Sequence, residues 1–338
     1  MLYFLAILFA LNINMLHASS HHEFSQLDPN IKIKQLALNG DAIQQTNLAT
    51  FFYEKNDYKS AAKWYKKAAK AGISQAQVNL GVMYSLGRGV SQNYKLAAYW
   101  YEKSAKQGNS SAQANLAGLY SKGNGVDKNY KKAAYWYKKA ANQGDNHSQT
   151  NLGLLYLTGK GVQKDARTAL EYFRKAALKG NAIAESNIAV MYFTGDGVNK
   201  NLRLAAKWYK RSAKSKYAPA QYNLGLMYYK GQGLTLNYKK AAFWFKKAAE
   251  NGYSIAQYKL GILYYYGKGV PINQLASLLF FNISLNNGFE PAKNNISFLA
   301  SKRPYVEIKM IQDLTDEWFK AQDVEIILSK LPKQTTRM

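Results

Sequence analysis

The stretch from Ser74 to Asn109, SQAQVNLGVMYSLGRGVSQNYKLAAYWYEKSAKQGN, decides the fold because the chain repeats it several times at the same length. One asparagine and one tyrosine of this unit recur every 36 residues, at Asn79, Asn115, Asn151, Asn187 and Asn223 and at Tyr84, Tyr120, Tyr156, Tyr192, Tyr228 and Tyr264. Self-similarity at this period predicts a solenoid of stacked supersecondary units rather than a closed enzyme fold.

Each unit has the pattern of two helices, which we call helix A and helix B. Residues 76–84 place apolar side chains at helical spacing, which predicts helix A, and Gly87 ends it because glycine tolerates a positive φ. Helix B is predicted over residues 94–106. Small residues such as Gly81 let the helices approach closely, and large ones such as Trp100 fill the gaps between pairs.

The repeat register divides the chain into six complete units, at 74–109, 110–145, 146–181, 182–217, 218–253 and 254–289. A shortened unit is predicted over 41–73, preceded by a flexible segment over 19–40. A degenerate half repeat is predicted over 290–303. Residues 304–338 are predicted to form capping helices and a tail, because a solenoid needs a terminal element with one polar face. A partner-docking helix is the alternative interpretation of this last region.

The order of three motifs resembles that of a known repeat family. Asn-Leu-Gly-x-x-Tyr starts at Asn79, Gly-x-Gly-Val follows at Gly87, and Ala-Ala-Tyr-Trp-Tyr-Lys-Lys-Ala-Ala stands at 133–141 in the next copy. This order resembles the Sel-1-like repeat, a relative of the tetratricopeptide repeat, over about 42–300. The resemblance implies an all-α, right-handed α-solenoid of about seven helix pairs plus a C-terminal capping region, with helix A on the concave side and helix B on the convex side. It also implies adaptor roles in bacterial envelopes, secretion and host contact.

The N-terminal residues have the composition of an export signal. The first 22 residues contain no Asp, Glu, Lys or Arg, and Leu2 to Leu16 is mostly apolar. Leu16-His17-Ala18 is similar to the small-residue end of a secretory signal peptide. We therefore predict a signal peptide over 1–18 and a periplasmic or secreted protein. An uncleaved anchor is the alternative.

The search for catalytic motifs finds one weak candidate. Ser60 and Lys63 have the Ser-x-x-Lys spacing of penicillin-recognising enzymes, but the companion Ser-Asp-Asn and Lys-Thr-Gly motifs are absent. A serine at the start of a helix is better explained by capping. The absence of Cys excludes thiolate nucleophiles and disulfides. We expect no catalysis and no cofactor. The alternative function is a cell-wall-associated factor or enzyme that binds peptidoglycan or penicillin-like ligands.

A metal site is conceivable only at the mature N-terminus. If cleavage exposes Ser19, the sequence Ser19-Ser20-His21 offers an amine, two amides and an imidazole, a set that suits Cu(II) or Ni(II). A solvated polar tail is the alternative interpretation.

The asparagine column is the first candidate binding feature. In related tetratricopeptide domains, an Asn before Leu-Gly on helix A faces the groove and bonds a peptide backbone. By this resemblance, the column would form a peptide ladder made of Asn79, Asn115, Asn151, Asn187 and Asn223. The alternative is that each Asn bonds a neighbouring helix and sets the stacking of repeats.

Positions i, i+4 and i+7 of helix A share one face and form the second candidate feature. They change from small residues in the early units to aromatic residues in the late ones. This trend predicts an apolar groove with aromatic anchors at Phe193, Tyr222, Tyr229, Tyr258 and Tyr265. Tighter packing of a narrower superhelix is the alternative.

A basic column on helix B is the third candidate feature. The formal net charge is +26, and one helix-B column contains Lys67, Lys103, Lys139, Lys175, Arg211 and Lys247. Such a face can hold anionic lipid headgroups, acidic cell-wall polymers or acidic proteins, and a solvated face is the alternative. No nucleic acid is expected, because no recognition motif is present. The sequence therefore predicts an exported, monomeric bacterial scaffold that binds protein segments in its concave groove.

Overall fold

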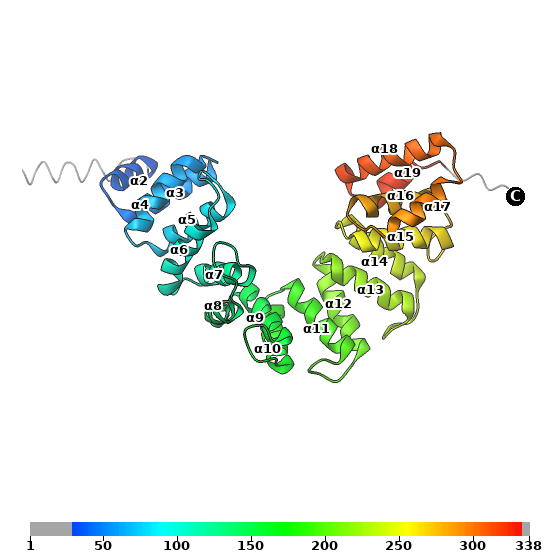
Figure 1. Ribbon diagram of the computed structural model, residues 1–338, viewed down its shortest axis with the longest axis horizontal. Helices are drawn as coiled ribbons and strands as arrows, with labels where there is room; N and C mark the ends of the chain where they lie inside the picture. The colour runs from blue at the N-terminus through cyan, green and yellow to red at the C-terminus, as the bar shows by residue number, and fades with distance from the viewer. Residues whose placement is uncertain (1–28, 333–338) are drawn as a thin grey trace, which may run out of the picture. The chain divides into compact units, whose positions relative to one another are not determined.

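The computed structural model describes residues 29–332 and confirms the predicted all-α solenoid, with eighteen helices and no strand in this range. Within each unit, helices that are consecutive in the chain pack on one another, as α5 does on α6 and α13 does on α14 (Figure 1). The contacts divide the chain into two units. Unit 1 extends to Ser148 and includes residues 160–162, and unit 2 comprises residues 149–159 and the chain from Gln163 onward.

Unit 1 contains a leading helix and three helix pairs. Its helices are α2 (Pro29–Leu38), α3 (Ala42–Glu54), α4 (Tyr58–Lys70), α5 (Ser74–Leu86), α6 (Tyr94–Lys106), α7 (Ser110–Lys122) and α8 (Tyr130–Asn142). The helices α3, α5 and α7 are A helices, and α4, α6 and α8 are B helices.

Unit 2 continues the alternation and ends in a group of irregular helices. The A helices are α9 (Asn146–Thr158), which begins three residues before the boundary, α11 (Ala182–Thr194), α13 (Ala218–Lys230) and α15 (Ser254–Tyr266). The B helices are α10 (Ala166–Leu178), α12 (Leu202–Lys214), α14 (Tyr238–Glu250) and α16 (Gln274–Asn286). The chain ends with α17 (Ala292–Ala300), α18 (Tyr305–Ala321) and α19 (Val324–Ser329).

Two glycines show how the repeat motif holds its helices together. Gly81 of α5 lies against the ring of Tyr101 on α6, and a Cβ at Gly81 would come within 2.6 Å of that ring. Gly125, in the turn after α7, has φ +68°, and a Cβ there would lie 2.2 Å from the backbone carbon of Tyr94 in the preceding repeat. The first glycine therefore sets the spacing within a pair, and the second sets the contact between pairs.

A chain of side-chain amides also joins successive repeats. The Gln77 side chain donates to the Ala69 carbonyl at 3.1 Å and accepts from Gln107 at 2.8 Å. The same arrangement occurs at Gln113 with Gln143, at Gln221 with Asn251 and at Gln257 with Asn287. Each of these buried amides is thus satisfied by a carbonyl of the preceding repeat and by a side-chain amide at the end of its own repeat.

One predicted boundary differs from the structure. The segment 19–40 was expected to be flexible, but residues 29–38 form α2. Ala37 is fully buried, and Gln45 donates to its carbonyl at 3.1 Å, the bond that Gln77 makes to Ala69. The helix α2 therefore occupies the position of a B helix in front of the shortened unit. The aromatic pair that marks the other B helices is missing from it, so sequence periodicity does not reveal it.

The C-terminal helices cover the last B helix. Trp318 of α18 is buried and meets Phe280 of α16 edge-on, with ring centroids 6.0 Å apart. Val324 and Ile327 of α19 are buried in the same core, whereas charged side chains of α18 such as Asp313 and Lys320 remain exposed. No helix within residues 29–332 is long and apolar enough to cross a membrane.

Candidate functional site

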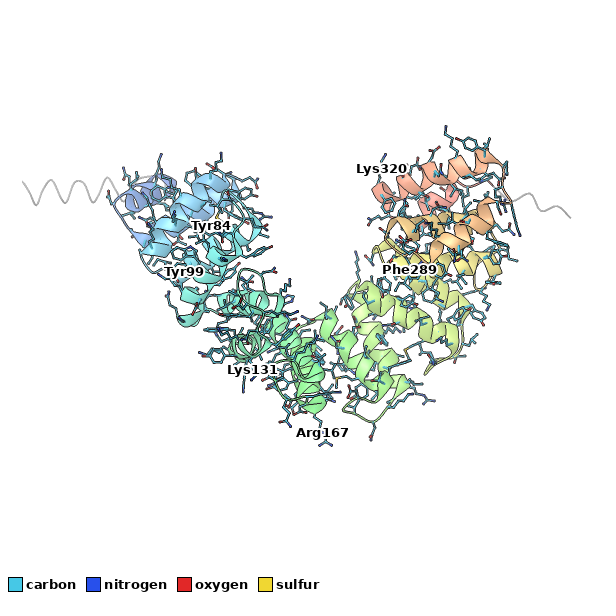
Figure 2. The ribbon with its side chains drawn as sticks, viewed as in Figure 1. Tyr84, Tyr99, Lys131, Arg167, Phe289 and Lys320 are labelled. Carbon is cyan, nitrogen blue, oxygen red and sulfur yellow. The ribbon has the colours of Figure 1, made fainter. Side chains whose placement is uncertain are left out.

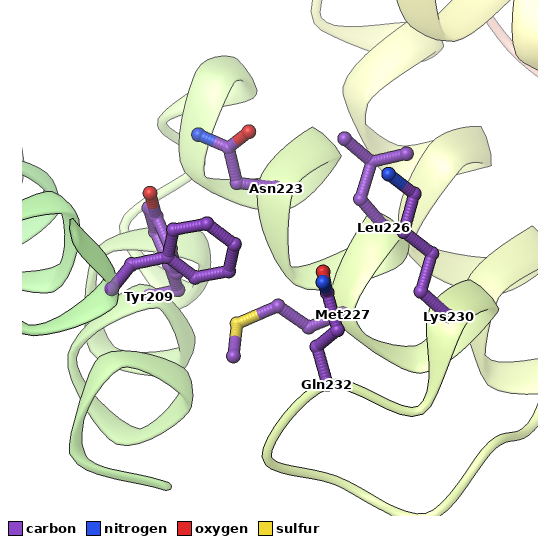
Figure 3. Close-up of a pocket in the computed structure, with 7 residues that line it drawn as sticks. Tyr209, Asn223, Leu226, Met227, Lys230 and Gln232 are labelled. Atoms are coloured by element: carbon purple, nitrogen blue, oxygen red, sulfur yellow. The ribbon is translucent and has the colours of Figure 1, made fainter. Parts of the chain in front are cut away.

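Unit 2 contains a pocket of about 220 Å³ between neighbouring repeats (Figure 3). Tyr209 on α12 and Asn223 on α13 supply a hydroxyl and an amide, and Leu226 and Met227 supply an apolar wall. Phe193, at the end of α11, Lys230 and Gln232 complete the lining. The pocket is therefore built from two successive A helices and the B helix between them.

Unit 1 contains a pocket of about 390 Å³ at the corresponding place. Tyr65 on α4 and Asn79 on α5 supply the hydroxyl and the amide, and Val82 stands where unit 2 has Leu226. Tyr53, at the end of α3, corresponds to Phe193, and Thr50 and Glu54 complete the lining. The same arrangement of an A helix, a B helix and the next A helix therefore forms a pocket in both units.

The tyrosine and the asparagine of each pocket are neighbours in its lining. Burial raises the pKa of Tyr209 to about 12, against the opposing effect of its hydrogen bond with Asn223. Burial also raises the pKa of Tyr65, whose hydroxyl lies 2.9 Å from the Thr50 hydroxyl and bonds Asn79. Both phenols are therefore protonated at neutral pH and can donate as well as accept. A hydroxyl and an amide side by side on an apolar wall suit the backbone of an extended peptide together with one apolar side chain.

The two pockets differ in charge. The unit 2 pocket has the cation of Lys230 at its edge, and the unit 1 pocket has the exposed carboxylate of Glu54. The unit 2 pocket thus favours an acidic neighbour beside the apolar side chain. The unit 1 pocket has charges of both signs, because Arg88 donates to the hydroxyl of Tyr53 in its lining.

The structure divides the asparagine column, all five members of which are half-buried. Asn79 and Asn223 line the pockets, and Asn79 also accepts from the Gln75 side chain at 3.0 Å. Asn187 donates to the Ile183 carbonyl of its own helix at 2.9 Å, and its neighbouring B helix has Phe173 in place of the tyrosine. Asn115 and Asn151 have the tyrosines Tyr101 and Tyr137 at the pairing position.

The predicted aromatic anchors also occupy two kinds of place. Tyr222 packs between Phe245 and Tyr253, with centroids 5.5 and 5.4 Å away, and Tyr258 packs on Phe281 and Phe289 at 5.3 and 5.0 Å. These two rings therefore pack helix A on the B helix and closing turn of their own repeat.

The remaining anchors are equally half-buried but make different contacts. Tyr229 accepts from Lys268 at 3.1 Å, Tyr265 meets only Tyr266 edge-on among the ring contacts of the described chain, and Phe193 lines the unit 2 pocket. Position i of the stripe thus packs on its own repeat at Tyr222 and Tyr258. Position i+4 at Val82 and Leu226, and position i+7 at Phe193, line the pockets. Sequence reasoning missed the pocket tyrosines Tyr65 and Tyr209, although their 36-residue recurrence with Tyr101 and Tyr137 was a usable signal.

The basic column on the B helices is exposed and rests on aromatic rings. Lys67 lies 4.4 Å from the Trp64 ring, Lys103 lies 4.8 Å from Tyr99, and Lys139 lies 4.9 Å from Tyr135. Lys175 lies over Tyr172 in the same way. The other two members form ion pairs, Arg211 with Glu185 at 2.9 Å and Lys247 with Glu250 at 2.8 Å.

The weak catalytic and metal candidates gain no support. Ser60 lies in the first turn of α4, where its backbone amide donates to the Asp57 carboxylate at 3.1 Å. Hydrogen bonds from the Ser60 side chain and amide lower the pKa of Asp57. Lys63 is exposed. In the range 29–332, no cluster of three or more His, Cys, Asp or Glu could hold a metal ion. Ser19, His21 and the predicted signal peptide lie outside the described residues.

Comparisons with known proteins agree with this architecture. The family model of the Sel1 repeat matches seven times, at 45–73, 74–109, 110–145, 146–181, 182–217, 218–253 and 254–289. A Sel1 repeat protein from Oxalobacter formigenes, known from its crystal structure, is 32% identical, with a TM-score of 0.66 over 71% of this chain and 96% of its own. No curated protein matches the chain.

Two further solved structures are similar with lower scores. The protective antigen c5321 of uropathogenic Escherichia coli is 27% identical, with a TM-score of 0.42 over 91% of this chain and 83% of its own. The immunity protein Pa5087 of Pseudomonas aeruginosa is 21% identical, with a TM-score of 0.43 over 65% and 83%. The repeated family match, the 32% identity and the stacked helix pairs lead to one conclusion: this chain belongs to the Sel1 repeat family.

Proposed function

We propose that the protein is a non-catalytic adaptor that binds extended protein segments on the pocketed face of its A helices. Sel1 repeat proteins are commonly protein-interaction scaffolds, which supports the general class. The observation that carries the specific proposal is the recurrence of one site in both units. Each pocket pairs a protonated tyrosine with an asparagine on an apolar wall.

The chemistry of these groups matches that of a peptide in extended conformation. An extended backbone exposes N–H and C=O groups along its length, and the asparagine amide can bond both kinds. An apolar side chain of the guest would contact Leu226 and Phe193 in unit 2, and Val82 and Tyr53 in unit 1. Phe193, Tyr229 and Tyr265 are the aromatic anchors under this proposal, and Tyr222 and Tyr258 support them by packing.

The proposed place of action is the bacterial envelope or the cell exterior. Its support is the uncharged apolar stretch of Leu2 to Leu16 and the bacterial source of the similar Sel1 repeat protein. Partners there would be proteins or peptides.

A random-peptide display library tests the binding proposal. The double variant Phe193→Ser/Leu226→Ser removes the apolar wall of the unit 2 pocket. It should bind the peptides that the wild-type chain retains at least ten-fold more weakly. The matched control is Phe243→Ser, since Phe243 is 51% exposed on helix B of the same unit. If the pocket variant retains the same peptides as the control, the proposal is wrong.

A second variant tests the charge at the pocket edge. Lys230→Glu should shift the selected peptides from acidic toward basic residues beside the apolar position, because the edge charge selects the neighbour. An unchanged selection would place the peptide elsewhere on the surface.

A further inference from the structure

The B helices of unit 1 present a face of unusual composition. The helices α4, α6 and α8 contain twelve lysines, all of them exposed, and a single acidic residue, Glu102. Glu102 is paired with Lys106 at 2.7 Å. The face therefore lacks acidic side chains to neutralise it, and it attracts an anionic surface.

Two exposed aromatic rings lie within this basic face. Tyr99 on α6 is 47% exposed and Tyr135 on α8 is 53% exposed, at equivalent positions of consecutive repeats. Each ring meets a buried tryptophan edge-on, Tyr99 with Trp100 and Tyr135 with Trp136, at centroid distances of 5.0 Å in both cases. The tyrosines are therefore held in place at the surface.

Helical spacing surrounds each ring with cations. Lys95 and Lys103 lie one turn before and one turn after Tyr99, and Lys131 and Lys139 are placed in the same way around Tyr135. Figure 2 shows Tyr99 and Lys131 projecting from these helices. Leu96, 39% exposed, adds apolar area one turn from Tyr99.

We propose that this face, formed by Tyr99, Tyr135 and the surrounding lysines of α4, α6 and α8, binds the surface of an anionic phospholipid bilayer. Lysines near a membrane are attracted by its negative surface potential, and tyrosine prefers the boundary between headgroups and acyl chains. An acidic polymer would satisfy the lysines but gives the exposed rings and Leu96 no apolar region to enter. The proposal concerns a different face from the peptide pockets and does not depend on them.

Vesicle cosedimentation of the full chain tests this assignment. We expect binding to vesicles that contain phosphatidylglycerol, at least ten-fold weaker binding to phosphatidylcholine alone, and loss of binding in about 0.5 M salt. Lys103→Glu/Lys139→Glu should weaken binding at least ten-fold. The control Lys122→Glu/Lys128→Glu, which makes the same charge change at exposed positions outside the B helices, should bind nearly as the wild type does. All variants share residues 1–28, so binding through that apolar segment would be equal in each of them.

The tyrosines distinguish a bilayer from a soluble polyanion. Tyr99→Ser/Tyr135→Ser leaves the charge unchanged and should weaken vesicle binding several-fold, with the helical circular dichroism signal retained. If this variant binds vesicles as tightly as the wild type does, and binds polyglutamate as tightly as the wild type does, the rings have no role at a bilayer. That result would show an acidic polymer partner and overturn the proposal. Equal binding by the Lys103→Glu/Lys139→Glu variant and the Lys122→Glu/Lys128→Glu control would also overturn it.

Discussion

The B helices α8 and α16 occupy the same place in the repeat but have opposite surroundings. On α8, Tyr135 is 53% exposed, with exposed lysines one turn away on either side. On α16, the equivalent residue Leu279 is fully buried, and no residue of the helix is charged. The difference arises because α18 packs on α16 and brings Trp318 into the same core. A single column of the repeat can therefore be surface or core, depending on whether a terminal helix covers it.

The largest effect that this comparison predicts is a contrast between two truncations at that column. Leu279→Ala should lower the free energy of unfolding by about 2–5 kcal/mol, because it leaves a cavity under α18. Tyr135→Ala should cost no more than about 1 kcal/mol, because it removes an exposed ring and its edge contact with Trp136. Urea unfolding measures both values, and hydrogen exchange of the α16 amides locates the loss, since repeat arrays can unfold in parts.

Phe319→Ala is the control for this contrast. Phe319 lies on α18 next to Trp318 but is 40% exposed, so its truncation should have a much smaller effect than that of Leu279. Equal losses for Leu279→Ala and Tyr135→Ala would mean that α18 does not cover α16 in solution.

Most of the fold could be predicted because the repeat motif is local. The B helix predicted over residues 94–106 coincides with α6, and the A helix predicted over 76–84 lies within α5. The glycine and alanine positions that set the helix spacing are visible in the sequence as fixed columns. The helix α2 could not be predicted in this way, because Ala37 is held by contacts with α3 and the helix lacks the aromatic marker of its relatives.

The candidate site was less predictable because one sequence column can serve two roles. The helix face that predicts anchors at Tyr222 and Tyr229 is a single stripe, but its two members make different contacts. Tyr222 packs on rings of its own repeat, whereas Tyr229 accepts from Lys268 of the next repeat. The pocket residues come from three helices, so Tyr209 and Asn223 become neighbours only through the packing of repeats. Helical spacing predicts which residues share a face of a helix, but the burial of each of those residues depends on the helices packed against that face.

A smaller effect is expected at Ser277, which lies two residues before Leu279 on α16. Other B helices have a fully buried alanine here, such as Ala133 on α8 and Ala241 on α14. The Ser277 hydroxyl is buried without a hydrogen-bond partner in the described part of the chain. Ser277→Ala should therefore raise the free energy of unfolding by about 1–2 kcal/mol, because it removes an unsatisfied buried group. The reverse change, Ala133→Ser, should lower it, and a loss of stability in Ser277→Ala would show that the hydroxyl has a partner.

Arg211 on α12 is an intermediate case between the exposed face of α8 and the covered face of α16. It is an exposed cation that forms an ion pair with a buried acid. Glu185, whose side chain is 4% exposed, replaces the glutamine of the amide chain. Arg211 donates to Glu185 at 2.9 Å and to the Ala177 carbonyl at 3.3 Å, the carbonyl equivalent to those that the glutamines bond elsewhere. The arginine thus replaces the donor that a glutamine would supply.

The smallest predicted effect is the pH dependence of stability that results from having Glu185 in place of the repeat's glutamine. Burial raises the pKa of Glu185 above its ordinary value of 4.5, although Arg211 lowers it. A raised pKa means that the folded state holds the proton more tightly, so this group's contribution to stability is lost as the pH rises from 4.5 through the raised value. Glu185→Gln removes that loss and restores the repeat's own donor to Ala177. Its urea midpoint relative to wild type should therefore rise between pH 4 and pH 7, and a relative midpoint that falls over this range would show that the ion pair outweighs the cost of burying the carboxylate.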